Sequence, residues 1–149
     1  MPLPVYRVCR APYARLDGLG ARLAGGRWNS RGRAVVYMAE SLALAVLENL
    51  VHMSRQDFPN GYVIVGAVIP DGVPILAEEQ VRSAGGLQGA PPQAVGDYWF
   101  DQELSVALPV PSAVVPGERN YLLHPAHPEF GRIVAARPIP FDFDPRLFA

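Results

Sequence analysis

Residues 25–48 predict a loop, a strand and a helix in immediate succession, and this run constrains the fold more than any other part of the chain. Gly25 and Gly26 allow a tight turn at its start, and residues 35–39 are typical of a short strand. Nearly every position from 42 to 51 is apolar, which predicts a central helix that packs on several sides. The rest of the chain is then expected to form a core around this helix.

Arg27, Tyr37 and Glu48 are the polar side chains that this run carries among apolar neighbours, and we predict that they face one pocket. A guanidinium beside a glycine turn suits a phosphate or a carboxylate. Glu48 has apolar neighbours along the helix except for His52, and a charged side chain is almost never fully buried without a partner. The residues alone leave two interpretations open. One is structural, with Glu48 in an ion pair with Arg27 or in an i,i+4 contact with His52, and the other is a site in which Arg27 and Glu48 contact a ligand.

The remaining elements predict one mixed α/β (α+β) domain over residues 1–149. Strands are expected at residues 5–9, 35–39, 62–69, 104–108, 113–115, 121–123 and 133–136. The apolar helix is expected to begin after Ser41 and to end near His52 or Arg55, and Asp97 is expected to cap a second, short helix.

Three segments carry more specific expectations. Residues 62–69 are almost all apolar and mostly β-branched, which predicts a strand buried on both faces. Residues 78–92 are polar and then rich in glycine and proline, which predicts a long, mobile surface loop. Residues 12–26 predict a loop with one irregular helical turn. The 16 prolines lie largely at junctions and in the last third, because proline does not fit inside a central strand.

The overall charge and the cysteine content exclude several classes of protein. A formal net charge of -1, with no long run of either sign, argues against a nonspecific nucleic-acid or membrane-surface binder. Cys9 is the only cysteine, so a reducing compartment is expected. The first residues lack the pattern of a signal peptide, and no apolar run approaches the ~20 residues that span a bilayer. We therefore expect a cytoplasmic protein.

Familiar catalytic motifs are missing from the sequence. Gly18 and Gly20 begin a dinucleotide fingerprint, but Leu23 stands where the third glycine belongs. The chain contains no lysine, hence no Walker-type phosphate loop, and it has no Gly-x-Ser-x-Gly elbow. His124 and His127 are too far from other ligand types in the sequence to predict a metal site, so no metal is expected.

Several short segments resemble the motifs of the RES-domain toxins: Tyr6-Arg7, Gly25-Gly26-Arg27-Trp28-Asn29, Val36-Tyr37-Met38-Ala39, residues 42–48, Val110-Pro111-Ser112, residues 120–125 and residues 141–146. The segments occur in the family's order and cover nearly the whole chain. The family is named for Arg, Glu and Ser, which here fall on Arg27, Glu48 and Ser112. His124 is a departure, because such proteins more often carry asparagine before the proline.

The resemblance implies a bacterial toxin of a toxin–antitoxin pair that consumes NAD. Its implied fold is similar to that of ADP-ribosylating toxins, with a mixed, split β-sheet around an NAD cleft. The implied partner is a helix-turn-helix antitoxin of the Xre type, which covers the active site and binds the operator, so that contact with DNA is indirect. By the same resemblance, Arg27, Tyr37 and Glu48 form the active trio and Ser112 and Asn120 line the NAD pocket.

Tyr6 is a weaker NAD-binding candidate on the same grounds. Physical chemistry agrees with this reading, since nicotinamide leaves as a neutral molecule and needs no general acid. Glu48 is then expected to accept a hydrogen bond from a ribose hydroxyl and to stabilise the developing positive charge. Arg27 is expected to hold the pyrophosphate, and the ring of Tyr37 to pack on nicotinamide or ribose.

The acceptor of the ADP-ribosyl group is left open by the sequence. Water gives an NAD hydrolase, phosphate gives an NAD phosphorylase, and a protein side chain gives an ADP-ribosyltransferase. NAD breakdown is favoured over protein modification. A third hypothesis, from another class, is a non-catalytic domain whose apolar cleft binds a peptide or a partner helix.

Overall fold

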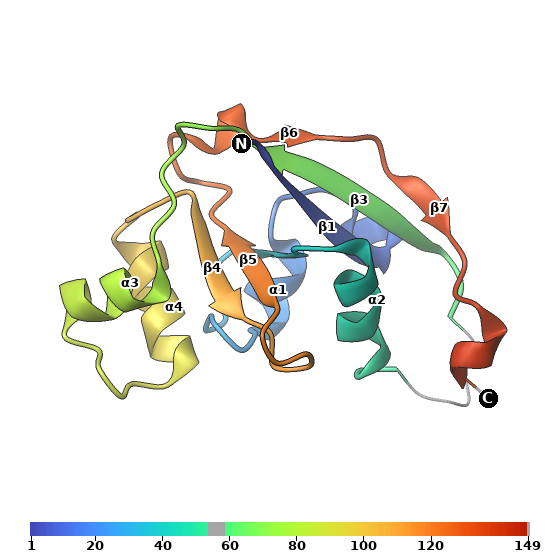
Figure 1. Ribbon diagram of the computed structural model, residues 1–149, viewed down its shortest axis with the longest axis horizontal. Helices are drawn as coiled ribbons and strands as arrows, with labels where there is room; N and C mark the ends of the chain where they lie inside the picture. The colour runs from blue at the N-terminus through green and yellow to red at the C-terminus, as the bar shows by residue number, and fades with distance from the viewer. Residues whose placement is uncertain (54–58, 149) are drawn as a thin grey trace.

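The computed structural model describes residues 1–53 and 59–148, whose elements surround one curved sheet (Figure 1). The strands are β1 (Leu3–Arg10), β2 (Val36–Ala39), β3 (Tyr62–Ile69), β4 (Ala107–Pro111), β5 (Arg119–Leu123), β6 (Val134–Ala135) and β7 (Ile139–Phe141). The helices are α1 (Leu19–Ala24), α2 (Leu42–Leu50), α3 (Glu78–Gly85) and α4 (Pro92–Asp101), with short 3-10 turns at η1 (Ala11–Tyr13), η2 (Phe130–Arg132) and η3 (Pro145–Phe148). No helix in these ranges is long and apolar enough to cross a membrane.

The sheet is divided between β1 and β2. Its strand order is β4-β5-β2-β1-β3-β6, with β7 also paired to β3. β1 pairs with β3 along its whole length, whereas its register with β2 consists of Tyr6 opposite Ala39. All the named strand pairs are antiparallel, and a parallel contact occurs as an isolated bridge between Ile75 and Ala107. The expected mixed α/β fold is confirmed, but the sheet is antiparallel in all its named pairs and is not the mixed sheet that was expected.

Each half of the sheet is covered by different helices. α2 packs on β1, and its core includes Leu44, Ala45 and the C-terminal Phe143. α3 and α4 pack together beside β4, and their core contains Trp28 and Trp99. Figure 1 shows α3 and α4 at the left end of the molecule and α2 right of centre, below β1 and β3, with β4 and β5 between the two groups of helices. Helices therefore pack on the sheet on each side of the division between β1 and β2.

α2 begins as predicted but is less buried than predicted. Ser41 caps it, since its Oγ accepts a hydrogen bond from the Leu44 amide at 3.1 Å. The helix ends at Leu50, close to the predicted end at His52, while the alternative end at Arg55 lies outside the described residues. The expectation of packing on several sides is wrong, because only one face of the helix meets the sheet. Leu47 and Val51 on the opposite side are 41% and 56% exposed.

Residues 78–92 are not the predicted loop, because they contain α3 and the start of α4. Glycine and proline mark the ends of these helices instead of breaking them. Gly86 ends α3 in the left-handed conformation, with φ of 63°, and Pro92 occupies the first turn of α4, where its missing N–H costs nothing. Asp97 therefore lies inside α4 and is not its cap.

The strand predictions are correct where a strand is central and poor at the edges. β3 has the predicted bounds, but burial on both faces is wrong: Val65 is buried while Val68 is 38% exposed. β4 begins three positions later than predicted and includes Pro109, which an edge strand tolerates. No strand forms at residues 113–115, and β7 was not predicted.

Candidate active site

A cavity of about 680 Å³ opens where the sheet divides, a size that suits a small-molecule ligand. Its walls come from the second half of β1, from β2, from the later part of α2 and from the loop before β2. The predicted site residues on these walls are Tyr6, Arg27, Tyr37, Glu48 and Asn120. Arg27, Tyr37 and Glu48 therefore line one cavity, as the sequence predicted.

Glu48 is held through one of its two carboxylate oxygens. Its Oε1 accepts hydrogen bonds from Ser112 Oγ at 2.7 Å and from Asn120 Nδ2 at 2.8 Å. Within residues 1–53 and 59–148, Oε2 has no hydrogen-bond partner and no ion pair joins Glu48 to Arg27. The structural ion pair that the sequence left open is therefore not formed. One oxygen fixes the carboxylate, and the other is available to a ligand.

Ser112 lies behind Glu48 and is not part of the cavity wall. It is only 8% exposed, and its Oγ also accepts hydrogen bonds from the amides of Val114 and Val115, both at 3.0 Å. Because both amides occupy the oxygen as an acceptor, the hydroxyl proton is directed to Glu48. Ser112 thus orients the carboxylate, whereas Asn120 both contacts Glu48 and lines the cavity.

Arg27 lies at the tip of a tight turn. The backbones of Gly26 and Asn29 hydrogen-bond to each other in both directions, at 2.9 and 3.4 Å, so Arg27 and Trp28 are the two residues of the turn. Gly25 precedes the turn with φ of 76°, a conformation that favours glycine. Trp28 is buried in the core, and the exposed Arg27 lines the cavity beside it.

The cavity wall carries more positive than negative charge. Arg7, Arg10, Arg15 and Arg27 line it together with the carboxylates of Asp17 and Glu48. No ion pair occupies any of these four arginines within the part of the chain that the structure describes. Arg7 was not predicted to be a site residue. Its Nη1 donates to the carbonyl of Tyr37 at 3.2 Å, across the division of the sheet. Such a wall attracts an anionic ligand.

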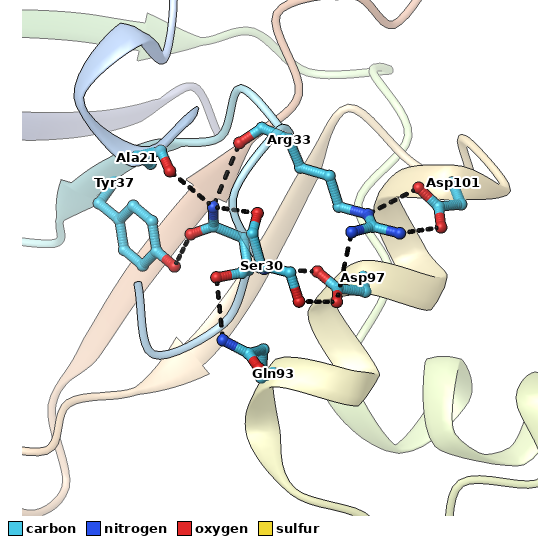
Figure 2. Close-up of polar contacts among 8 residues, drawn as sticks. Ala21, Ser30, Arg33, Tyr37, Gln93, Asp97 and Asp101 are labelled. Carbon is cyan, nitrogen blue, oxygen red and sulfur yellow. Dashed lines mark hydrogen bonds and ion pairs between the residues drawn. The ribbon is translucent and has the colours of Figure 1, made fainter. Parts of the chain in front are cut away.

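Both hydrogen-bonding functions of the Tyr37 hydroxyl are occupied by the protein. The hydroxyl donates to Asn29 Oδ1 at 2.7 Å, a contact drawn as a dashed line from Tyr37 in Figure 2. It also accepts from the Trp28 amide at 3.0 Å. Burial raises the pKa of Tyr37 to about 12, so the hydroxyl stays protonated at neutral pH. Tyr37 therefore offers a ligand its ring, while its hydroxyl is bound to the loop that carries Arg27.

His124 lies away from the cavity. It is 2% exposed, stacks on Phe100 with ring centroids 4.0 Å apart, and has its Nε2 2.9 Å from the Phe100 carbonyl. Burial lowers the pKa of His124, which favours the neutral ring. The histidine at position 124, where the family more often has asparagine, is therefore a core residue and does not line the cavity. Among the described residues, no group of His, Cys, Asp and Glu side chains is arranged to hold a metal ion.

Asn29 and Asn49 also contribute to the site, and the sequence did not assign a role to either. Asn29 is fully buried beneath the turn. Asn49 donates from Nδ2 to the carbonyl of Val8 at 2.7 Å, which ties α2 to β1 beside Glu48. The available signal was an amide side chain at an otherwise apolar position, since a buried polar group requires partners.

Comparisons with known proteins agree with this geometry. The model of the RES domain matches residues 4–144. The chain is 38% identical over 140 residues to the "Prs ADP-ribosylating toxin" of Sphingobium sp. (strain YBL2), covering 89% of this chain and 86% of that protein. It is 35% identical over 149 residues to the "Toxin Res" of Yersinia enterocolitica, covering 96% of this chain and 98% of that protein.

A solved structure has a similar fold. The crystal structure of the M. tuberculosis MbcT–MbcA toxin–antitoxin complex contains a chain that matches with a TM-score of 0.70 and 22% identity. The match covers 99% of this chain and 87% of that chain. The fold of the present chain is therefore that of a protein solved together with its antitoxin.

Proposed function

The chain belongs to the RES-domain family, and from that premise we propose that it is the toxin of a toxin–antitoxin pair and cleaves the nicotinamide–ribose bond of NAD. One observation carries the proposal: Glu48 is fixed through Oε1 by Ser112 and Asn120, while its other oxygen has no partner among the described residues. We further propose that residues 1–149 form one RES domain.

The bond that breaks joins the anomeric carbon of ribose to the pyridinium nitrogen. The electron pair of this bond moves to the nitrogen, so nicotinamide leaves as a neutral molecule and no residue has to protonate it. Positive charge develops on the ribose, and the free oxygen of Glu48 stabilises this charge and accepts a hydrogen bond from a ribose hydroxyl. A single carboxylate is sufficient for this step.

The arginines of the cavity wall hold the pyrophosphate. Arg27 lies at the tip of its turn without a carboxylate partner in the described chain, and a guanidinium can bind a phosphate through two parallel hydrogen bonds. The ring of Tyr37 packs against nicotinamide or ribose, since its hydroxyl is already occupied. Asn120 and Tyr6 contact the ligand from the cavity wall.

The acceptor divides the proposal into two candidate functions. With water or phosphate as the acceptor, the toxin depletes NAD by hydrolysis or phosphorolysis, which we favour. With a protein side chain as the acceptor, it is an ADP-ribosyltransferase, and the name of the Sphingobium relative supports this second candidate. The bond-breaking step and its residues are the same in each case.

The proposed partner is a protein antitoxin that covers the cavity. The related fold was solved in a toxin–antitoxin complex, which supports a partner of this kind. We propose that it is a helix-turn-helix protein of the Xre type, through which the complex contacts DNA. A toxin that consumes NAD acts in the cytoplasm, where its substrate is found.

The test is to incubate the purified protein with NAD and to follow free nicotinamide, with and without added phosphate. Release of ADP-ribose indicates hydrolysis, release of its 1-phosphate indicates phosphorolysis, and transfer of label from NAD to a protein indicates ADP-ribosylation. If NAD remains intact under all these conditions, the enzyme hypothesis is wrong. The chain would then be better explained as a non-catalytic partner-binding domain.

A further inference from the structure

The buried side chain of Asn29 joins three parts of the fold through hydrogen bonds. It is 0% exposed, and its Nδ2 donates toward the carbonyls of Ala21, Ser30 and Arg33 at 3.0, 3.1 and 3.2 Å. Its Oδ1 accepts the hydroxyl proton of Tyr37 at 2.7 Å. A buried amide is costly unless its hydrogen bonds are made, and here donors and acceptor are all occupied. The end of α1, the turn and β2 therefore meet at one side chain.

The backbone of Asn29 closes the turn that carries Arg27. It pairs with Gly26 in both directions, and its carbonyl also accepts a hydrogen bond from Gln93 Nε2 at 3.3 Å. The other central residue of the turn is Trp28, whose amide donates to the Tyr37 hydroxyl. Asn29 and Tyr37 thus hold the turn on both sides of Arg27.

Gly26 shows how closely the turn fits this network. A Cβ atom at Gly26 would lie 2.7 Å from the Tyr37 hydroxyl and 2.8 Å from Asn29 Oδ1. Real Cβ atoms do not approach polar atoms this closely, so the turn and the Tyr37–Asn29 hydrogen bond fit together only with glycine at this position. The sequence Gly26-Arg27-Trp28-Asn29 is therefore a structural unit and more than an anion-binding loop.

One face of α4 supports the same turn from outside. Gln93, Asp97 and Asp101 lie four residues apart along this face. Asp97 accepts hydrogen bonds from the amide and the hydroxyl of Ser30, and Asp101 pairs with Arg33 at 2.7 Å (Figure 2). These contacts anchor the backbone on the far side of Asn29, so the turn cannot move as a rigid flap without breaking them.

We infer that Asn29 is a positioning residue, which acts through the Tyr37 hydroxyl and the Trp28 amide to hold Arg27 at the cavity. This inference rests on the proposed function, because it assigns Arg27 to the pyrophosphate of NAD. It also assigns the Tyr37 hydroxyl to the loop and not to the reacting atoms. The ring of Tyr37 keeps its place on the cavity wall.

The first test needs no NAD and follows the loop directly. Hydrogen exchange of the Trp28 amide and trypsin cleavage after Arg27 are compared in wild type, Tyr37→Phe and Asn29→Ala. We expect both rates to rise about tenfold or more in the two variants, because each removes a buried hydrogen-bond partner. Ser105→Ala is the matched control: it removes a buried hydroxyl that is bonded to Trp99 and Ala107 and makes no hydrogen bond to residues 26–29. Unchanged exchange and cleavage in Tyr37→Phe would overturn the inference.

The second test separates binding from chemistry. In Tyr37→Phe we expect KM for NAD to rise about tenfold, with kcat within about threefold of wild type, since a displaced Arg27 weakens binding of the pyrophosphate. In an Arg27→Ala background the same substitution should raise KM no further, because its effect passes through Arg27. A large fall in kcat at constant KM would instead assign the hydroxyl to the reaction and overturn the inference. If wild type cleaves no NAD, the proposed function fails while the exchange experiment still decides the role of Asn29.

Discussion

Glu48 combines a fixed oxygen with a free one, and this asymmetry separates its structural role from its chemical role. Ser112 and Asn120 donate hydrogen bonds to Oε1. These two hydrogen bonds require an acceptor oxygen at this position but not a negative charge. A glutamine at this position keeps an acceptor oxygen for both donors but places an uncharged amide where Oε2 stands. Folding and chemistry can therefore be tested separately at this residue.

We predict that Glu48→Gln folds with near-wild-type stability and loses NAD cleavage by about 10²-fold or more, the loss that follows removal of a charge-stabilising group. Nicotinamide release measures the activity, and urea denaturation measures the stability. Glu40→Gln is the matched control: Glu40 accepts the Arg119 amide at 2.9 Å and does not line the cavity. A large loss of stability with activity retained in Glu48→Gln would show that the carboxylate is structural.

The protonation of His124 affects the stability of the folded chain. Its Nε2 faces the Phe100 carbonyl, which can only accept, so this nitrogen carries the proton of the neutral ring. Its Nδ1 is buried and has no hydrogen-bond partner among the residues that the structure describes. Burial lowers the pKa of His124, so below the unfolded value of ~6.5 the unfolded chain binds more protons than the folded chain. The folded state therefore loses stability as pH falls.

We predict that the free energy of unfolding decreases from pH 7.5 to pH 5.5 less steeply in His124→Gln than in wild type. Glutamine keeps a donor for the Phe100 carbonyl and does not titrate. The difference in slope should approach but not exceed ~1.4 kcal/mol per pH unit, the limit for one proton. Urea denaturation at several pH values measures it. His127→Gln is the control, and equal slopes in wild type and His124→Gln would contradict the prediction.

At the scale of elements, α4 and the turn before β2 are in direct backbone contact. A Cβ atom at Gly96 would lie 1.7 Å from the Trp28 carbonyl oxygen, so the helix approaches the turn more closely than any other residue type permits. This contact explains a glycine in the interior of a helix, where glycine is otherwise unfavourable relative to alanine by roughly 0.5–1 kcal/mol. At Gly96, close packing against Trp28 outweighs the low helix propensity of glycine.

We predict that Gly96→Ala destabilises the protein by about 1–3 kcal/mol or more, because the helix must move away from Trp28. Gly20→Ala in α1 is the matched control: its Cβ would meet Tyr13 at 3.8 Å, an ordinary contact, so propensity should stabilise it by roughly 0.5–1 kcal/mol. Urea denaturation measures the change in the free energy of unfolding, which should be a decrease in Gly96→Ala and an increase in Gly20→Ala. Equal effects at the two glycines would contradict the packing argument.

The elements that the sequence predicted well are those defined by local chemistry. β3 has the expected bounds because its apolar run is flanked by Gly61 and Pro70, and Ser41 caps α2 through its own hydroxyl. α3 was missed because the glycines and prolines at its ends resemble those of a loop. The exposed side of α2 was missed because an apolar helix does not show which of its faces the sheet will cover.

The site could be predicted only in part for a different reason. Arg27, Tyr37 and Glu48 lie within one short run, so a pocket shared by them follows from local structure. Ser112 and Asn120 are separated from Glu48 by 64 and 72 positions, and the sequence resemblance named them without their contacts. That they bind the same oxygen depends on the pairing of β4, β5 and β2. Long-range register of this kind cannot be derived from residue patterns alone.

At the scale of the whole molecule, the division of the sheet converts a scaffold into a site. Tyr6 opposite Ala39 is the pairing that joins β1 to β2, and the cavity opens beyond it with Arg7 reaching across. The four arginines on its wall have no ion-pair partners in the described chain, so their positive charge is available to an anionic ligand. We therefore expect this cavity to favour an anionic ligand over a cationic one.

We predict that expression of the chain without its antitoxin lowers cellular NAD before growth stops, because loss of NAD is the cause of arrest in the proposed function. NAD content and cell density are followed from the time of induction. At equal protein level, Glu48→Gln should leave NAD content and growth unchanged, while Glu40→Gln should behave as wild type. Of these two glutamates, Glu48 lines the cavity and Glu40 does not. Growth arrest with constant NAD, accompanied by ADP-ribosylated protein, would favour the transferase candidate. Arrest by Glu48→Gln itself would contradict both enzymatic candidates and favour a non-catalytic interaction with a cellular partner.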